Sequence, residues 1–147
     1  MNAPITVVAA VIEQSGFILI CQRRRGDRFE LKWEFPGGKV QPGETPQQAL
    51  LRELKEELQV SAKIGPELHR TRHRYAEEDL EVELIFFAVT LGPETLMNRA
   101  FEQMVWADHA RLPTYDFLPA DRELVQRLAT ARAEIRKSLP KGWEETK

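Results

Sequence analysis

The chain opens on an apolar, β-branched run that needs burial. Apart from Thr6, every side chain of residues 5–12 is apolar. The run is too short to cross a bilayer. It has no basic segment before it and Glu13 directly after it, which speaks against a secretion signal. We therefore interpret it as a buried strand. A second apolar run, Phe17–Cys21, follows the turn residues 14–16, so the two runs predict a β-hairpin.

Length and composition favour one soluble domain. The chain has 147 residues, of which 42% are hydrophobic and 30% charged, so a packed core is expected and disorder is not. A net charge of −2 is not typical of a nucleic-acid-binding protein. The single cysteine, Cys21, excludes an internal disulfide framework and agrees with a reducing, cytoplasmic compartment. We expect one domain over residues 1–139, a C-terminal tail over 140–147 and no membrane partner.

The clearest helix is predicted over residues 46–58. Thr45 is a favourable N-cap, Pro46 occupies the first helical position, and Gln48 completes a capping box. Apolar residues recur every four positions and predict a buried face, formed by Leu50, Leu54 and Leu58.

Two further strands are predicted to pair around a polar turn at residues 76–79. In an antiparallel register Arg72 faces Glu83 and Arg74 faces Glu81. A strand follows over 85–91 and a short one over 104–106. The last helix is expected to begin near residue 119 or 120, with a core stripe of Leu124, Leu128, Ala131 and Ile135.

Three carboxylates on the predicted helix suggest metal chemistry. Glu53, Glu56 and Glu57 stand at positions i, i+3 and i+4, so they share one helix face and we expect them to converge. Carboxylate oxygens suit Mg²⁺ or Mn²⁺, and Mg²⁺ commonly completes its shell with substrate phosphates. The alternative is a solvated acidic face, which three glutamates alone would favour.

The surrounding residues change that balance. The segment 38–60, GKVQPGETPQQALLRELKEELQV, resembles the Nudix box, G-x5-E-x7-R-E-U-x-E-E-x-G-U, where U is apolar. Gln59 replaces the late glycine at a helix end, where a left-handed backbone costs a non-glycine residue about 1 kcal/mol. The resemblance implies an α/β fold, an α/β/α sandwich around a mixed β-sheet.

The resemblance also implies roles for individual residues. The expected Mg²⁺ ligands, with Mn²⁺ as a substitute, are the Gly38 carbonyl, Glu53, Glu56 and Glu57. Glu53 is expected also to act as general base or to position the attacking water, Arg52 to orient a carboxylate and Glu44 to support the metal shell. Glu102 is a possible additional carboxylate from a loop before a late strand.

Two segments resemble the MutT branch of this family: residues 33–39, WEFPGGK, and residues 118–121, LPAD. That branch hydrolyses nucleoside triphosphates to the monophosphate and pyrophosphate. Its members act on 8-oxo-dGTP, or on CTP and modified pyrimidine triphosphates. The implied substrate-binding residues are Arg23, Phe35 and Asp121. Each has a simpler alternative: a member of a solvated basic cluster for Arg23, core packing for Phe35, and a helix cap for Asp121.

Several alternatives stay open from the residues alone. An ionised Asp121 would favour the paired donors of a guanine-type edge, but aspartate also occurs in cytidine-preferring relatives. A Nudix hydrolase for another diphosphate, such as ADP-ribose, is a second enzymatic hypothesis. A non-catalytic binding module is a third, disfavoured by the intact set of carboxylates. The protein is expected to be a monomer or a homodimer.

Overall fold

The computed structural model describes residues 4–138, with side chains through Ala131. The strands are β1 (Ile5–Gln14), β2 (Phe17–Gln22), β3 (Trp33–Glu34), β4 (Gly37–Lys39), β5 (Ala62–Tyr75), β6 (Leu80–Leu91) and β7 (Gln103–Asp108). The α-helices are α1 (Pro46–Leu58) and α2 (Arg122–Ser138), and short 3₁₀ turns cover Ala76–Glu78, His109–Thr114 and Pro119–Asp121. The expected tail, residues 140–147, lies outside the described residues.

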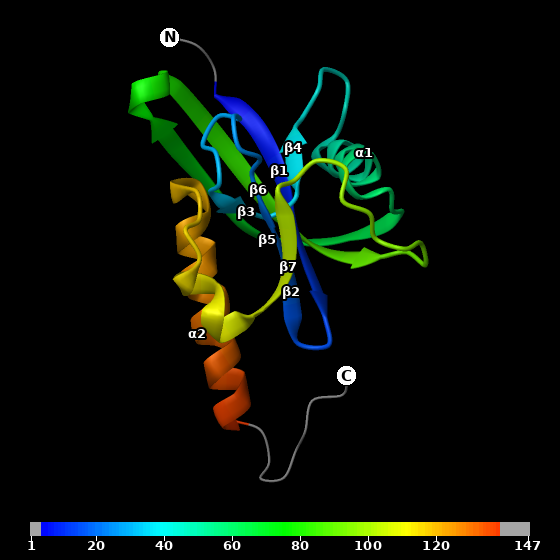
Figure 1. Ribbon diagram of the computed structural model, residues 1–147, viewed down its shortest axis with the longest axis vertical. Helices are drawn as coiled ribbons and strands as arrows, with labels where there is room; N and C mark the ends of the chain where they lie inside the picture. The colour runs from blue at the N-terminus through cyan, green and yellow to red at the C-terminus, as the bar shows by residue number, and fades with distance from the viewer. Residues whose placement is uncertain (1–3, 139–147) are drawn as a thin grey trace.

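The strands form one mixed sheet in the order β3-β2-β1-β6-β5, with β4 added beside β1 and β7 beside β2. β1 runs parallel to β6, whereas its pairings with β2 and β4 are antiparallel. β1 therefore lies at the centre of the sheet, which agrees with its unbroken apolar run. In Figure 1 the sheet stands between the two helices.

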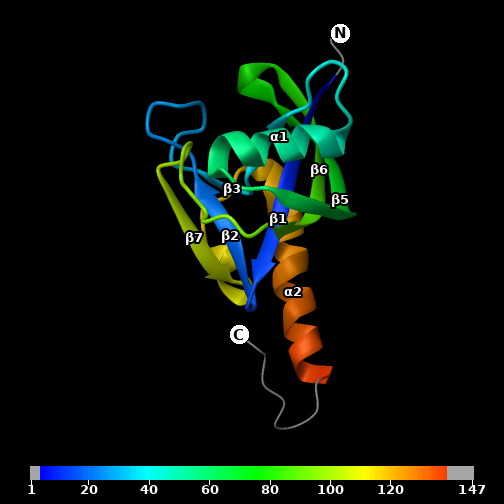
Figure 2. The same ribbon diagram turned by 90° about the vertical axis from the view of Figure 1, so that its right-hand side faces the viewer.

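The two faces of the sheet have separate cores. Val8, Ala10 and Ile12 of β1 pack in the cluster that contains the buried residues of α1. Ala9 and Val11 point to the opposite face, into the cluster that contains Leu124 and Val125 of α2, because successive strand residues alternate in direction. Figure 2 shows α1 in front of the sheet and α2 behind it. The predicted α/β/α sandwich around a mixed sheet is confirmed.

Both predicted hairpins are present. Ser15 and Gly16 both have positive φ, 54° and 84°, which is the backbone of a tight two-residue turn between β1 and β2. In the second hairpin Arg72 pairs with Glu83 and Arg74 with Glu81 in register, as predicted.

The beginning of the last helix and its buried stripe differ from the prediction. A 3₁₀ turn occupies residues 119–121 and the α-helix begins at Arg122. Leu124 is buried but Ala131 is exposed, so the stripe was wrong there, and the side chain of Ile135 lies outside the described part. Val125 is the second buried residue at this end. The buried contacts of the helix, among the described side chains, gather in its first turns. Among the described residues no helix is long and apolar enough to span a membrane.

Candidate active site

Helix α1, which carries the acidic residues, is fixed by its N-terminal capping box and by packing on the sheet. Its N-terminus has the predicted capping box: the Thr45 hydroxyl accepts from the Gln48 N–H at 3.1 Å, and the Gln48 side chain accepts from the Thr45 N–H at 2.9 Å. The helix is held on the sheet by Ala49, Leu50, Leu54 and Leu58, which are fully buried. Glu53 and Glu57 lie at the edge of this buried face, against β4, and Glu56 is exposed.

Arg52 organises the carboxylates around it. Its guanidinium donates to both oxygens of Glu44, at 2.7 and 2.9 Å, and to the Lys39 carbonyl oxygen at 3.0 Å. The same guanidinium donates to Glu53 at 2.9 Å and to Glu56 at 3.4 Å. These hydrogen bonds, those to Glu44 first, raise the pKa of Arg52 further above its usual range. Arg52 thus orients Glu53, as the resemblance implied, and Glu44 orients Arg52.

Glu57 occupies the most buried of the acidic positions. Its Oε1 accepts from the Gly37 N–H at 3.1 Å. Burial first, and then the charges of Glu53 and Glu34, raise the pKa of Glu57 to about 9. Burial also raises the pKa of Glu53, against the opposing effect of Arg52. Burial and the neighbouring negative charges thus disfavour the ionised form of these carboxyls. A bound cation would favour the ionised form instead.

Gly38 lies directly against Glu53. A Cβ at this position would stand 2.6 and 2.7 Å from the two carboxylate oxygens, so only glycine lets the carboxylate approach the β4 backbone this closely. The arrangement brings the Gly38 backbone and a carboxylate side by side.

The carboxylates do not converge as expected. Within residues 4–138 no group of three Asp, Glu, His or Cys side chains stands close enough to hold a metal ion. The carboxylates are divided between two donors: Nη1 of Arg52 donates to both Glu53 and Glu56, whereas Glu57 accepts from the Gly37 N–H. The donor set is nevertheless all oxygen and clustered on one helix face, which fits Mg²⁺. The assignment of these residues as ligands stays a prediction.

A cavity of about 460 Å³ opens on the α2 side of the sheet and reaches Lys39, whose carbonyl oxygen accepts from Arg52 of α1. Its lining includes all three residues predicted to bind substrate, Arg23, Phe35 and Asp121. This volume is in the range of small-molecule sites. The structure also adds lining residues that had been given no individual role in substrate binding: Glu34, Phe29, Tyr75 and Leu118.

Asp121 is buried in this cavity. Only 3% of it is exposed, and its pKa is raised well above the usual range by burial first and then by the charge of Glu34. A hydrogen bond from the Phe35 backbone opposes that shift. Asp121 ends the 3₁₀ turn before α2, so its carboxyl is at the helix start and also turned toward β3.

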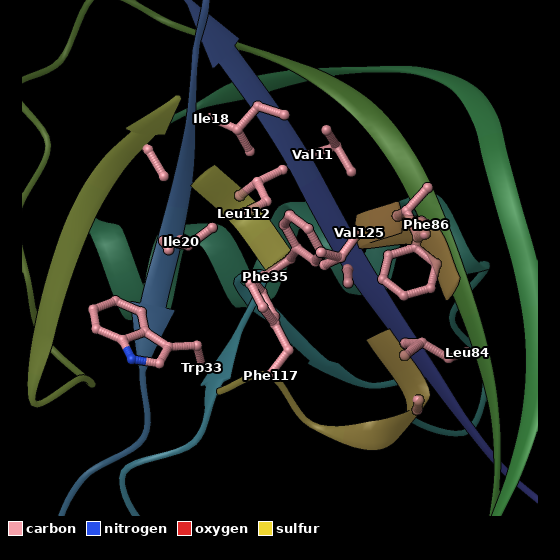
Figure 3. Packing of buried hydrophobic residues seen from close by; sticks show 14 of the residues in the cluster. Val11, Ile18, Ile20, Trp33, Phe35, Leu84, Phe86, Leu112, Phe117 and Val125 are labelled. Atoms are coloured by element: carbon pink, nitrogen blue, oxygen red, sulfur yellow. The ribbon is translucent and has the colours of Figure 1, made fainter. Parts of the chain in front are cut away.

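Phe35 packs in the core, and its role in substrate binding stays a prediction. It is 3% exposed, its ring is stacked on Phe117 at a centroid distance of 5.4 Å, and it meets Phe86 edge-on at 5.8 Å. Figure 3 shows Phe35 among these buried rings. It is therefore a core residue that also lines the cavity.

Arg23 is not a member of a solvated cluster. Its Nη1 lies 3.3 Å from both oxygens of Glu34, and its Nε donates to the Arg28 carbonyl oxygen at 2.6 Å. Arg24 and Arg25, next to it in the chain, are exposed or partly so. Glu34 was missed in the sequence although it lies in the segment resembling MutT proteins. The available signal was a carboxylate between two large aromatic residues in a short strand.

Glu102 lies at the basic loop. Its Oε1 accepts from the Arg25 N–H at 3.3 Å, and its own N–H donates to the Gln22 carbonyl oxygen at 2.9 Å. Over the described residues it has no hydrogen bond to α1. The structure therefore does not join Glu102 to the acidic helix, and its role as an additional carboxylate stays a prediction.

The chain has a mixed sheet with one helix on each face, and its acidic helix lies beside a Gly-Gly strand. This arrangement defines an α/β protein of the Nudix type. A family model described as the NUDIX domain matches residues 2–128, so the chain belongs to the Nudix family.

Two bacterial relatives are similar over most of their length. The CTP pyrophosphohydrolase of Escherichia coli K12 is 37% identical over 130 residues, covering 88% of this chain and 94% of the relative. The 8-oxo-dGTP diphosphatase of Haemophilus influenzae is 35% identical over 130 residues, covering 87% and 94%. The chain is accordingly a Nudix hydrolase of MutT-like type.

Solved structures agree on the fold. The solution structure of the E. coli ORF135 protein has a TM-score of 0.74 and 34% identity, covering 88% of this chain and 91% of that one. The MutT protein of Methanosarcina mazei has a TM-score of 0.78 at 21% identity, covering 90% and 98%, and supports the fold alone.

Proposed function

We propose that the protein is a Mg²⁺-dependent pyrophosphohydrolase that converts nucleoside triphosphates, 8-oxo-dGTP foremost, to the monophosphate and pyrophosphate. The observation that carries this proposal is the position of the cavity. A cavity with a buried carboxyl at its wall extends to Lys39 of β4, and the Lys39 carbonyl oxygen is hydrogen-bonded to Arg52 of the acidic helix, which is suited to a cation that binds phosphates. The proposed setting is sanitation of the nucleotide pool in the cytoplasm.

The metal site in this proposal consists of the Gly38 carbonyl, Glu53, Glu56 and Glu57. Bound Mg²⁺ would neutralise the charge that develops on the leaving pyrophosphate. Glu53 accepts the proton of the attacking water, and its pKa, raised by burial, makes it a stronger base than an exposed glutamate. Arg52 fixes the orientation of Glu53 through the 2.9 Å hydrogen bond, and Glu44 fixes Arg52.

CTP is the second candidate substrate, and Asp121 gives the reason. An ionised carboxylate only accepts hydrogen bonds and favours the two donors of guanine. Burial and Glu34 raise the pKa of Asp121, and a protonated carboxyl both donates and accepts. That combination also matches N3 and the exocyclic amine of cytosine. The relative named CTP pyrophosphohydrolase supports the same alternative.

The test is pyrophosphate release with Mg²⁺ over 8-oxo-dGTP, dGTP, CTP, dCTP, 5-hydroxy-dCTP, ADP-ribose and diadenosine tetraphosphate. A maximum at 8-oxo-dGTP supports the first substrate, and a maximum at CTP or a modified dCTP supports the second. Activity confined to the last two compounds would contradict the proposal while keeping the Nudix chemistry. No activity on any of them would favour a binding module.

A further inference from the structure

Glu34 lines the cavity, and its charge also affects Glu57 of the acidic helix. It is the last residue of β3 and pairs in register with Cys21 of β2. Its charge acts on Asp121 on one side and on Glu57 on the other, since it raises the pKa of both. Burial raises the pKa of Glu34 itself to about 7, although Arg23 opposes the shift. Burial of an ionisable carboxyl group costs folding free energy, so the position of Glu34 indicates a functional role.

The contacts of Arg23 indicate that role. Glu34 holds Nη1 with both carboxylate oxygens at 3.3 Å, and the carbonyl of Arg28 holds Nε at 2.6 Å. Two of the three guanidinium nitrogens are thus engaged. In the described part of the chain the third, Nη2, has no protein hydrogen-bond partner. Its two N–H groups remain available on a side chain that is 27% exposed and lines the cavity.

A cationic N–H pair seeks an oxygen acceptor. A nucleotide offers two kinds, the carbonyl oxygen of the base and the oxygens of the phosphates. The cavity favours the first, because Phe35 and Leu118 line it with apolar surface. A carbonyl oxygen of the base is uncharged, unlike a phosphate oxygen, so its binding adds no net charge to the cavity.

We propose that Glu34 is a positioning residue for base selection: it holds Arg23 so that Nη2 donates to a carbonyl oxygen of the base. The inference rests on the proposed function and adds to it the residue that orders the base-reading side chain. Glu34 acts through Arg23 and touches neither the phosphates nor the metal. Removing it must therefore weaken binding of carbonyl-bearing bases and leave binding of other bases unchanged.

The first test compares Glu34→Gln with the wild-type protein in steady-state hydrolysis. Glutamine keeps an acceptor but loses the charge that holds the guanidinium. We expect KM for the preferred carbonyl-bearing triphosphate to rise about tenfold, the size of one charged hydrogen bond, with kcat within about twofold. KM for dATP, whose base has no carbonyl, should not change. A fall in kcat at constant KM would overturn the proposal, since Glu34 would then act on the carboxylates of α1.

Asp116→Asn is the matched control. Asp116 forms an ion pair with Lys32, next to β3, at 2.8 Å, but on the exposed surface and outside the cavity lining. Loss of this neighbouring carboxylate should leave every KM unchanged.

A double-mutant cycle tests whether Glu34 acts through Arg23. In an Arg23→Leu background the further change Glu34→Gln should alter KM by less than about twofold, because the side chain it positions is gone. Additive effects of the two changes would overturn the proposal.

Calorimetric binding separates this inference from the proposed function, because it needs no turnover. The probes are the nucleosides cytidine and 8-oxo-deoxyguanosine, and inorganic pyrophosphate. Glu34→Gln should weaken nucleoside binding about tenfold and leave pyrophosphate binding unchanged. Weakened pyrophosphate binding with unchanged nucleoside binding would assign Arg23 to the phosphates and overturn the proposal. Absence of hydrolysis by the wild-type protein would instead contradict the proposed function.

Discussion

Single residues decide the chemistry proposed here, and Glu53 is the first of them. Its carboxylate lies against Gly38 and is oriented by Arg52 at 2.9 Å. We expect Glu53→Gln to lower kcat by about 10²-fold or more, the typical contribution of a general base, because the amide accepts no proton. The measurement is pyrophosphate release, with circular dichroism to show that the fold is retained. A variant with wild-type turnover would show that Glu53 is neither base nor ligand.

Asp121 is the residue whose effect should depend on the base. Its carboxyl is buried in the cavity and hydrogen-bonded by the Phe35 backbone. Replacement by alanine leaves the base without this polar partner, so KM should rise about tenfold for the preferred triphosphate and less for the others. Steady-state kinetics over the substrate panel measures the ratio. Equal effects on all bases would leave only a role at the start of α2.

At the scale of one element, the left-handed backbone at the end of α1 was predicted from the sequence. Gln59 is the C-cap residue with φ 56° and ψ 40°, and its N–H donates to the Lys55 carbonyl oxygen. A left-handed residue was expected here because the family position that matches Gln59 is glycine. That local prediction is confirmed by the structure.

The same residue yields a stability prediction. Gln59→Gly should raise the free energy of unfolding by about 1 kcal/mol, because glycine adopts this backbone without the Cβ clash. For a domain of this size that is a rise in Tm of about 2–4 °C. Urea and thermal unfolding measure it, with Gln59→Ala as the control, which keeps the Cβ and should not be stabilised. A glycine variant no more stable than the alanine variant would contradict the expected strain.

At the scale of the whole molecule, buried carboxyls couple folding to pH. The pKa of Glu57 is raised from 4.5 to about 9 and that of Glu34 from 4.5 to about 7, so the folded state binds more protons than the unfolded state between these limits. The contribution is favourable below about pH 4.5 and is lost as the pH rises. We expect the free energy of unfolding of the metal-free protein to fall between about pH 5 and pH 9.

Denaturant unfolding in EDTA across this range measures the effect. Glu57→Gln should flatten the upper part of the profile, since the amide does not ionise. Mg²⁺ should restore stability to the wild-type protein at pH 8, because a ligand that binds only the folded state adds to its stability. A metal-free wild-type protein whose stability rises from pH 5 to pH 9 would contradict the burial of these charges.

Local features of the sequence determined the elements. The capping box, the four-residue spacing of leucines and the alternation of charges in β5 and β6 each depend on neighbours along the chain or across one turn. For that reason helix α1 and the register of Arg72 with Glu83 followed from the residues. The resemblance to the Nudix box added the α/β/α layers and the residues of the acidic helix.

Only the tertiary structure decided how the site is put together. Arg23, Glu34, Tyr75 and Asp121 come from four separate segments, and the cavity that they share forms only once the sheet and the segment 118–121 have packed together. Glu34 was not predicted as a site residue, because its burial and the charges around it arise only in the folded structure. The acidic side chains are likewise divided by tertiary contacts, since Glu53 and Glu56 share Arg52 whereas Glu57 accepts from the Gly37 N–H. Contacts of this kind depend on packing between distant parts of the chain, which no local pattern contains.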